Sequence, residues 1–175
     1  MCEKTEKNID YPRKTLYLSI TIPMLMMYIA VAVFLWGMTK IGFVIYISLF
    51  LIVAIFQSYV CVYFECPYIG KFAPCVGGFC LPSSRIACLL KEVKPSERLF
   101  NIAVNIAFLA FASIIFFPIY FLYQQNLSFV VVYLMIVLVY AFIFLGWVCP
   151  VCATRRLCPG GQLAERIRKA IMGGR

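Results

Sequence analysis

Four long stretches without a charged residue limit what this chain can fold into. They cover residues 16–38, 41–64, 99–123 and 127–148, and each holds 22 to 25 residues. A helix of about 20 apolar residues crosses the hydrocarbon layer of a membrane. Composition agrees, because 64% of the residues are hydrophobic and 13% are charged, far from the averages of soluble domains. We therefore expect an all-α integral membrane protein with four transmembrane helices.

The basic residues predict how these helices are oriented. Lys and Arg number four before the first stretch, five between the second and third, and six after the fourth, whereas Lys40 is the one basic residue on the other side. Cytoplasmic loops carry the excess of Lys and Arg. We therefore expect a multi-pass protein of the cell membrane whose two termini, Cys-rich central loop and tail face the cytoplasm. This topology and the attraction to anionic lipid head groups account for the net charge of +9, so the expected partner is the lipid bilayer, with no nucleic acid.

A cysteine motif occurs twice in the chain. CPYIGKFAPCVGG begins at Cys66 and CPVCATRRLCPGG begins at Cys149, and at an offset of 83 residues they share two cysteines, one proline and two glycines. Further upstream, PRKTLY and PSERLF share a proline and a leucine at the same offset. We interpret residues 12–88 and 95–171 as an internal repeat within a single membrane domain. Two duplicated hairpins of the same topology are related by a pseudo-twofold axis along the membrane normal, so the two motifs are expected side by side at the inner surface.

Eight of the nine cysteines lie at or beyond the expected cytoplasmic ends of the second and fourth helices. Disulfides are rare in that reducing compartment, so metal binding or redox chemistry is the natural interpretation. The candidate metal ligands are Cys61, Cys66, Cys75, Cys80, Cys88, Cys149, Cys152 and Cys158. For Cys61 and Cys88, packing alone is an equal alternative, because cysteine also behaves as a small apolar residue.

The residues around these cysteines favour a site with sulfur ligands. Proline follows Cys66, Cys149 and Cys158 and ends the local helix, so that the chain can wrap around a site. Glycine pairs follow two cysteines and allow a tight backbone of positive φ whose amides point at a cofactor. These candidate cofactor-binding residues are Gly77, Gly78, Gly160 and Gly161. Thiolates prefer zinc or iron–sulfur clusters, and the absence of histidine excludes bis-histidine haem, Rieske clusters and His-containing zinc sites.

Two ligand schemes fit this pattern. In one, Cys66, Cys75, Cys149 and Cys158 meet near the pseudo-twofold axis and form one four-cysteine site that both halves share. In the other, all eight cysteines hold two [4Fe–4S] clusters, each with four thiolates. The repeat favours the first scheme and the number of cysteines favours the second. A zinc ion is the alternative to an iron–sulfur cluster.

The segment GWVCPVCATRRLCPGGQLAE, residues 146–165, carries a family resemblance. It is similar to the GW-CP and CP-G-L-E segments of membrane-bound polyferredoxin-type subunits in nitrate and nitrous oxide respiration, in which four transmembrane helices carry Cys-Pro motifs on the cytoplasmic side. The resemblance implies iron–sulfur electron transfer linked to a quinol pool. The chain departs from that family in its wider cysteine intervals.

Three functions follow from these features. The leading hypothesis is a membrane electron-transfer protein, in which one or two [4Fe–4S] centres at the cytoplasmic face pass electrons between other membrane or cytoplasmic redox subunits and a quinone-type carrier. The second is a membrane scaffold or assembly protein stabilised by a four-cysteine zinc site. The third is a thiol–disulfide oxidoreductase that uses CPVC at Cys149. We assign no catalytic residue, and whether the chain is an enzyme stays open.

Overall fold

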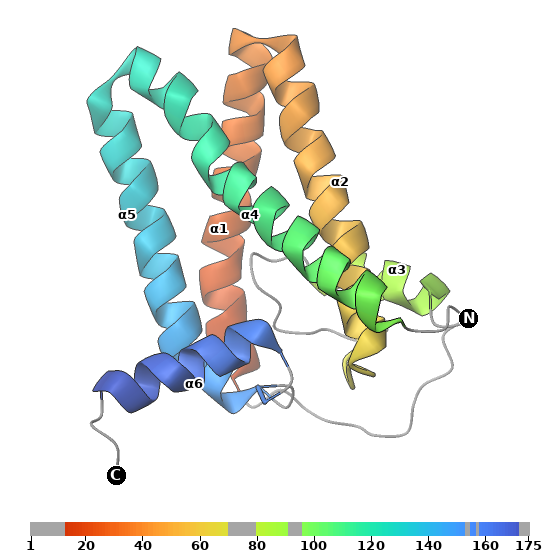
Figure 1. The fold of residues 1–175 in the computed structure, drawn as a ribbon. Helices are drawn as coiled ribbons and strands as arrows, with labels where there is room; N and C mark the ends of the chain where they lie inside the picture. Colours follow the sequence, from red (N-terminus) through yellow and green to blue (C-terminus); the bar gives the residue numbers. More distant parts are fainter. Residues whose placement is uncertain (1–12, 70–79, 91–95, 153–154, 157, 172–175) are drawn as a thin grey trace.

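The structure is a computed structural model that describes residues 13–69, 80–90, 96–152, 155–156 and 158–171. Its elements in order are α1 (Lys14–Met38), α2 (Lys40–Tyr63), α3 (Cys80–Leu90), α4 (Glu97–Gln125), α5 (Leu127–Ile143), the π-helical turn η2 (Phe144–Val148), the 3₁₀ turn η3 (Cys149–Val151) and α6 (Pro159–Ile171). The helices α1, α2, α4 and α5 form a bundle, and α3 and α6 lie at one of its ends (Figure 1). The described residues contain no β-strand.

Each of the four uncharged stretches folds into one long helix. All four are long and apolar enough to cross a membrane, and the fourth continues through η2 and η3. Their ends lie within three residues of the predicted ones, so the prediction of an all-α chain with four such helices is confirmed. Large apolar side chains such as Met26, Phe108 and Phe142 are exposed on the bundle, as suits a surface covered by lipid chains.

A single residue connects the two helices of each hairpin. Between α1 and α2, the Thr39 hydroxyl accepts a hydrogen bond of 3.2 Å from the Gly42 N–H. Between α4 and α5, the side-chain oxygen of Asn126 accepts one of 3.0 Å from the Ser128 N–H. Threonine and asparagine are preferred in this place because their oxygens satisfy N–H groups at the start of a helix. Consequently α1 and α4 begin, and α2 and α5 end, at the same end of the bundle, which we call the Cys-rich end.

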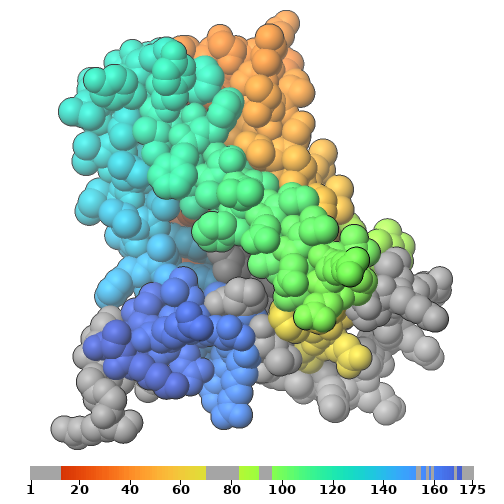
Figure 2. All heavy atoms as spheres, in the orientation of Figure 1, coloured from red at the N-terminus to blue at the C-terminus, as the bar shows by residue number. Residues whose placement is uncertain are grey.

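The long helices pack unequally in the two halves. Helix α4 crosses the bundle obliquely (Figures 1 and 2) and makes its most extensive contact with α2. In this contact the Phe100 ring stacks on Tyr63 with centroids 4.1 Å apart, and the Ser96 N–H donates to the Tyr59 hydroxyl at 2.9 Å. A twofold axis that relates the two hairpins would turn the α2–α4 contact into a contact of the same extent between α5 and α1. The α1–α5 contact is much smaller, so the packing of the long helices does not follow such an axis.

The order of elements nevertheless occurs twice, because two long helices are followed by a short one in α1–α2–α3 and again in α4–α5–α6. Helix α3 packs on α2, and α6 packs on η2 and η3. The hydroxyl of Ser84 in α3 donates to the Tyr68 carbonyl at 3.4 Å, and Gly161 and Ala164 of α6 are buried. Both short helices therefore pack against the bundle at its Cys-rich end (Figure 1).

Candidate functional site at the Cys-rich end

The end of α2 brings Cys66 back towards the helix. Glu65 has left-handed backbone, with φ of 47°. The Cys66 N–H donates to the Cys61 carbonyl and the Glu65 N–H to the Val62 carbonyl, both at 3.0 Å. This is the Schellman motif, which usually has glycine in the left-handed position, and another residue there costs roughly 1–2 kcal/mol. As a result, the thiols of Cys61 and Cys66 are hydrogen-bonded to each other.

The end of α5 changes its winding just before Cys149. Because Pro150 has no N–H, the α-helical pattern cannot continue through it, and the last residues form η2 and η3. Such π-helical turns are frequent at functional sites. The Phe144 ring in η2 stacks on Tyr140 with centroids 5.6 Å apart and lies 6.3 Å from the Tyr17 ring. These contacts hold η2 in the core, and Cys149 directly after it is buried.

The two Cys-Pro motifs make the same turn. The Ile69 N–H donates to the Cys66 carbonyl at 3.1 Å, and the Cys152 N–H donates to the Cys149 carbonyl at 3.2 Å. In each case the donor lies three residues after the cysteine, and proline has the second position, where its fixed φ suits a tight turn. In the second motif this turn carries Cys152 back beside Cys149.

Cys158 lies directly before α6, with its sulfur against the first helical turn. The N–H groups of Gly160 and Gly161 interact with that sulfur, and the Gln162 N–H donates to the Cys158 carbonyl at 3.0 Å. The expected positive φ is wrong for Gly161, which is helical. Glycine is needed there for a steric reason, because a Cβ would overlap the backbone of Arg155.

Three thiols of the second motif lie within electrostatic reach of one another, and one of them, Cys158, also lies within reach of Cys66. The Cys158 sulfur interacts with those of Cys66 and Cys152, and the Cys149 sulfur interacts with those of Cys152 and Cys158. All four, and Cys61, are thiols rather than disulfides. The structure therefore brings Cys66 from the first motif near Cys158 of the second, which in turn lies near Cys149 and Cys152.

Most of the other predicted site residues lie outside the part of the chain that the structure describes. Cys75, Gly77 and Gly78 lie outside the described residues, and the side chain of Cys80, the first residue of α3, is also not described. Cys88 is disulfide-bonded, and a disulfide sulfur is no thiolate ligand, so Cys88 is not a metal ligand in this structure. Across the described part of the chain, no three cysteine or acidic side chains converge closely enough to hold a metal ion.

The thiols of Cys66 and Cys158 are held in their neutral form. The hydrogen bond with Cys61, followed by burial, raises the pKa of Cys66, although the Tyr68 N–H lowers it. Burial raises the pKa of Cys158, against the opposing effect of the Gly160 and Gly161 N–H groups. An ordinary thiol has a pKa of about 8.5. In the metal-free protein the unfolded chain therefore loses protons that the folded chain retains, and the free energy of unfolding decreases as the pH rises above that value.

We predict from these pKa shifts that Cys158 in the metal-free protein reacts slowly with iodoacetamide at pH 8 and that its rate keeps rising well above pH 9, because the thiolate is the reactive form. Mass spectrometry of the Cys158 peptide at several pH values measures the rate. The denatured chain is the control. Equal rates for the folded and denatured chains at pH 8 would contradict the prediction.

Two arginines at this site bind backbone carbonyls, a role that the sequence interpretation did not assign to them. The Arg13 guanidinium donates to the Trp147 carbonyl at 2.8 Å, and that of Arg155 donates to the Pro150 carbonyl at 2.9 Å. The last carbonyls of a helix have no helical partner, and basic side chains near the end can bind them. The sequence could have indicated these hydrogen bonds, since basic residues flank an expected helix end.

Comparison with known proteins assigns no family. No family model, curated protein or solved structure matches the chain. The function proposed below therefore depends on the chemistry of the Cys-rich end itself.

Proposed function

We propose that the chain is a membrane electron-transfer protein that binds a cysteine-ligated iron–sulfur centre at the Cys-rich end. The proposed ligands are Cys66, Cys149, Cys152 and Cys158. One observation carries the proposal: the Cys158 sulfur interacts with Cys66 of the first motif and with Cys152 of the second, while Cys149 interacts with both Cys152 and Cys158. A [4Fe–4S] cluster takes four thiolates, which is the number that these residues supply.

The surroundings of the four thiols suit such a centre. Cys149 is 7% exposed and the other three are half-buried, so little water reaches the sulfurs. Two N–H groups already point at Cys158, and hydrogen bonds to sulfur and low exposure both tune the reduction potential of a cluster. Ligand thiols lose their protons on binding metal, and the four sulfurs have to approach one another further in that step. The cluster supplies one-electron transfer when it is bound.

The orientation and the partners belong to the same proposal. The Cys-rich end faces the cytoplasm, because 15 of the 16 basic residues lie before residue 16, between residues 64 and 99 or after residue 148, as the positive-inside rule requires. The two halves arose by duplication, which the matching Cys-Pro turns and the repeated element order support. The electron partners are other membrane or cytoplasmic redox subunits and a quinone-type carrier.

Elemental analysis of the protein after anaerobic purification tests the proposal. We predict about four iron and four sulfide ions per chain, the content of one [4Fe–4S] cluster, with visible absorbance that bleaches on reduction and an EPR signal in the reduced state. Zinc in place of iron would contradict the proposal and favour the scaffold held by a four-cysteine zinc site.

One observation favours a second function, thiol–disulfide exchange. Cys88 at the same end of the bundle is disulfide-bonded, while Cys149 and Cys152 are neighbouring thiols in one turn. Oxidation of this pair would form one S–S bond and release two protons and two electrons to a disulfide or quinone acceptor. Equilibration of the metal-free chain in glutathione redox buffers, followed by mass spectrometry, decides whether a Cys149–Cys152 disulfide forms.

A further inference from the structure

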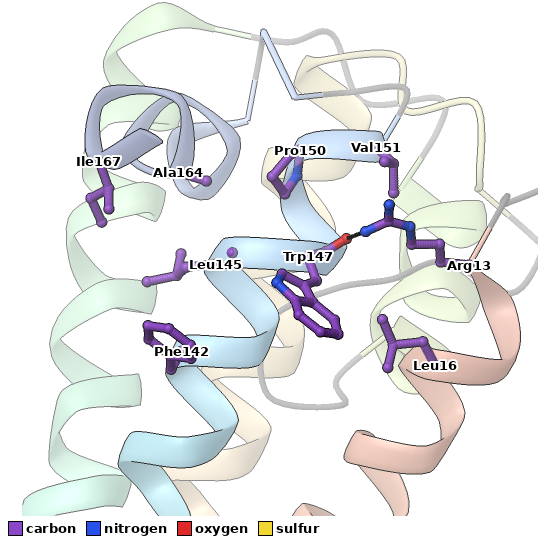
Figure 3. A pocket seen from close by; sticks show the side chains of 10 residues that line it. Arg13, Leu16, Phe142, Leu145, Trp147, Pro150, Val151, Ala164 and Ile167 are labelled. Atoms are coloured by element: carbon purple, nitrogen blue, oxygen red, sulfur yellow. Dashed lines mark hydrogen bonds between the residues drawn. The ribbon is translucent and has the colours of Figure 1, made fainter. Parts of the chain in front are cut away.

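A cavity of about 710 Å³ lies beside η2. Its walls come from the start of α1, the end of α5 with η2 and η3, and one side of α6 (Figure 3). Small-molecule sites in proteins have volumes of about 300–1,000 Å³, so the cavity has the size of a ligand site. Among the described residues that line it, Arg13 is the one charged side chain and the others are apolar.

One guanidinium group, that of Arg13, lines this cavity, and a second, that of Arg155, binds a residue of its wall. Arg13 binds the Trp147 carbonyl and Arg155 binds the Pro150 carbonyl, and both Trp147 and Pro150 belong to the cavity wall. Each guanidinium has five N–H donors, so several remain for a ligand, and both side chains are exposed. No acidic side chain is among the described lining residues. The cavity at Arg13 is therefore complementary to an anion such as a phosphate group, which arginine recognises well.

The rest of the cavity is lined by apolar residues from segments that lie at the lipid-facing surface of the bundle. Phe142 and Trp147 are 75% and 58% exposed on the outer surface of α5 and η2. Helix α6 contributes Ala164 and Ile167 to the cavity and exposes Arg166 on its polar side. A basic amphipathic helix of this kind lies in the membrane interface. The cavity therefore spans the boundary between lipid head groups and lipid chains.

We propose that this cavity binds one phospholipid with an anionic head group. The phosphate lies at Arg13, and an acyl chain lies along Phe142 and Ile167. A soluble anion would leave the apolar walls uncovered. A zwitterionic lipid would bring a cationic group as well as its phosphate to Arg13, so its net attraction to the guanidinium is weaker than that of an anionic lipid. The proposal does not depend on the iron–sulfur centre, because the thiols belong to neither end of the cavity.

The two tryptophans of the chain provide a matched test. Trp147 lines the cavity and Trp36 lies near the opposite end of α1, and their exposed fractions are similar, 58% and 55%. Brominated acyl chains quench tryptophan fluorescence on contact. The full chain with Trp36→Phe is placed in phosphatidylcholine vesicles that contain increasing fractions of brominated phosphatidylglycerol or brominated phosphatidylcholine. The chain with Trp147→Phe is the control.

We predict that brominated phosphatidylglycerol quenches Trp147 at a several-fold lower mole fraction than brominated phosphatidylcholine, whereas Trp36 shows no preference. Arg13→Gln keeps an N–H donor for the Trp147 carbonyl but removes the charge, and it weakens the preference about fivefold, as expected for one basic residue near an anionic surface. Arg98→Gln, which removes a charge at the start of α4, leaves the preference unchanged.

A second variant fills the cavity with a bulky side chain and leaves the charge of the protein unchanged. A Cβ at Gly146, a lining residue, meets nothing within 4 Å, and the same holds for Gly37 in α1. Gly146→Phe fills the cavity and abolishes the preference, whereas Gly37→Phe retains it, and circular dichroism checks that both variants fold. Equal quenching of Trp147 by the two lipids, or a preference that survives Arg13→Gln, would overturn the proposal.

Discussion

The Cys158→Ser variant is expected to lose most of its iron after anaerobic reconstitution with iron and sulfide. Cys158 is the sulfur that interacts with cysteines of both motifs, and its loss leaves three thiolates where a [4Fe–4S] cluster needs four. Removing even an outer partner of a metal ligand costs about 10–100-fold in affinity, so loss of a ligand is expected to cost at least that much. Iron and sulfide per chain are the measurement.

Two matched variants make this result specific. Cys88→Ser removes a disulfide-bonded cysteine of α3 and is expected to retain the iron. Cys61→Ser removes the hydrogen-bond partner of Cys66, and full iron content in this variant would exclude Cys61 as a ligand and with it the scheme in which all eight cysteines bind clusters. Full iron content in Cys158→Ser would refute the proposed ligand set.

The Gly161→Ala variant is expected to lose stability and iron together. The added methyl group would overlap the backbone of Arg155, and a backbone cannot move away by changing a rotamer. Overpacking of this kind typically costs about 1–3 kcal/mol of folding free energy, and we expect a cost near the upper end of that range. The shift that relieves the overlap also withdraws the Gly160 and Gly161 N–H groups from the Cys158 sulfur. Thermal unfolding in detergent and iron content after reconstitution are the two measurements.

Gly37→Ala is the control for this change. A Cβ at Gly37 meets nothing within 4 Å, and replacing glycine by alanine in a helix stabilises it by up to about 1 kcal/mol. We expect this variant to be at least as stable as the unchanged protein and to bind the same amount of iron. If Gly161→Ala behaves like Gly37→Ala, close approach to Arg155 is not what requires the glycine.

The long helices could be predicted because their cause is local. A stretch of uncharged residues of sufficient length forms a helix in a membrane whatever its neighbours are, since the backbone must satisfy its own hydrogen bonds there. The ends of α2 and α5 near Cys66 and Cys149 were also predictable, because proline stops a helix through its own missing N–H.

The cysteines that lie near one another could be predicted only in part. The repeat indicated Cys66, Cys149 and Cys158, and the Cys158 thiol lies near each of the other two. The fourth member in the structure is Cys152, because the turn after Cys149 folds it back, whereas Cys75 lies outside the described residues. Nothing in the sequence marks Glu65 as left-handed, since glycine is the usual residue in that position.

By itself, the sequence determined which segments become long helices, where prolines end them, and which side carries the basic charge, because each of these depends on neighbouring residues along the chain. Tertiary structure alone decided that Cys66 meets Cys158, that Gly161 lies on the backbone of Arg155, and that α1, η2 and α6 enclose a cavity. The first and the last of these join segments far apart in the chain, and the geometry of all three depends on how the chain packs at the Cys-rich end, which no local pattern encodes.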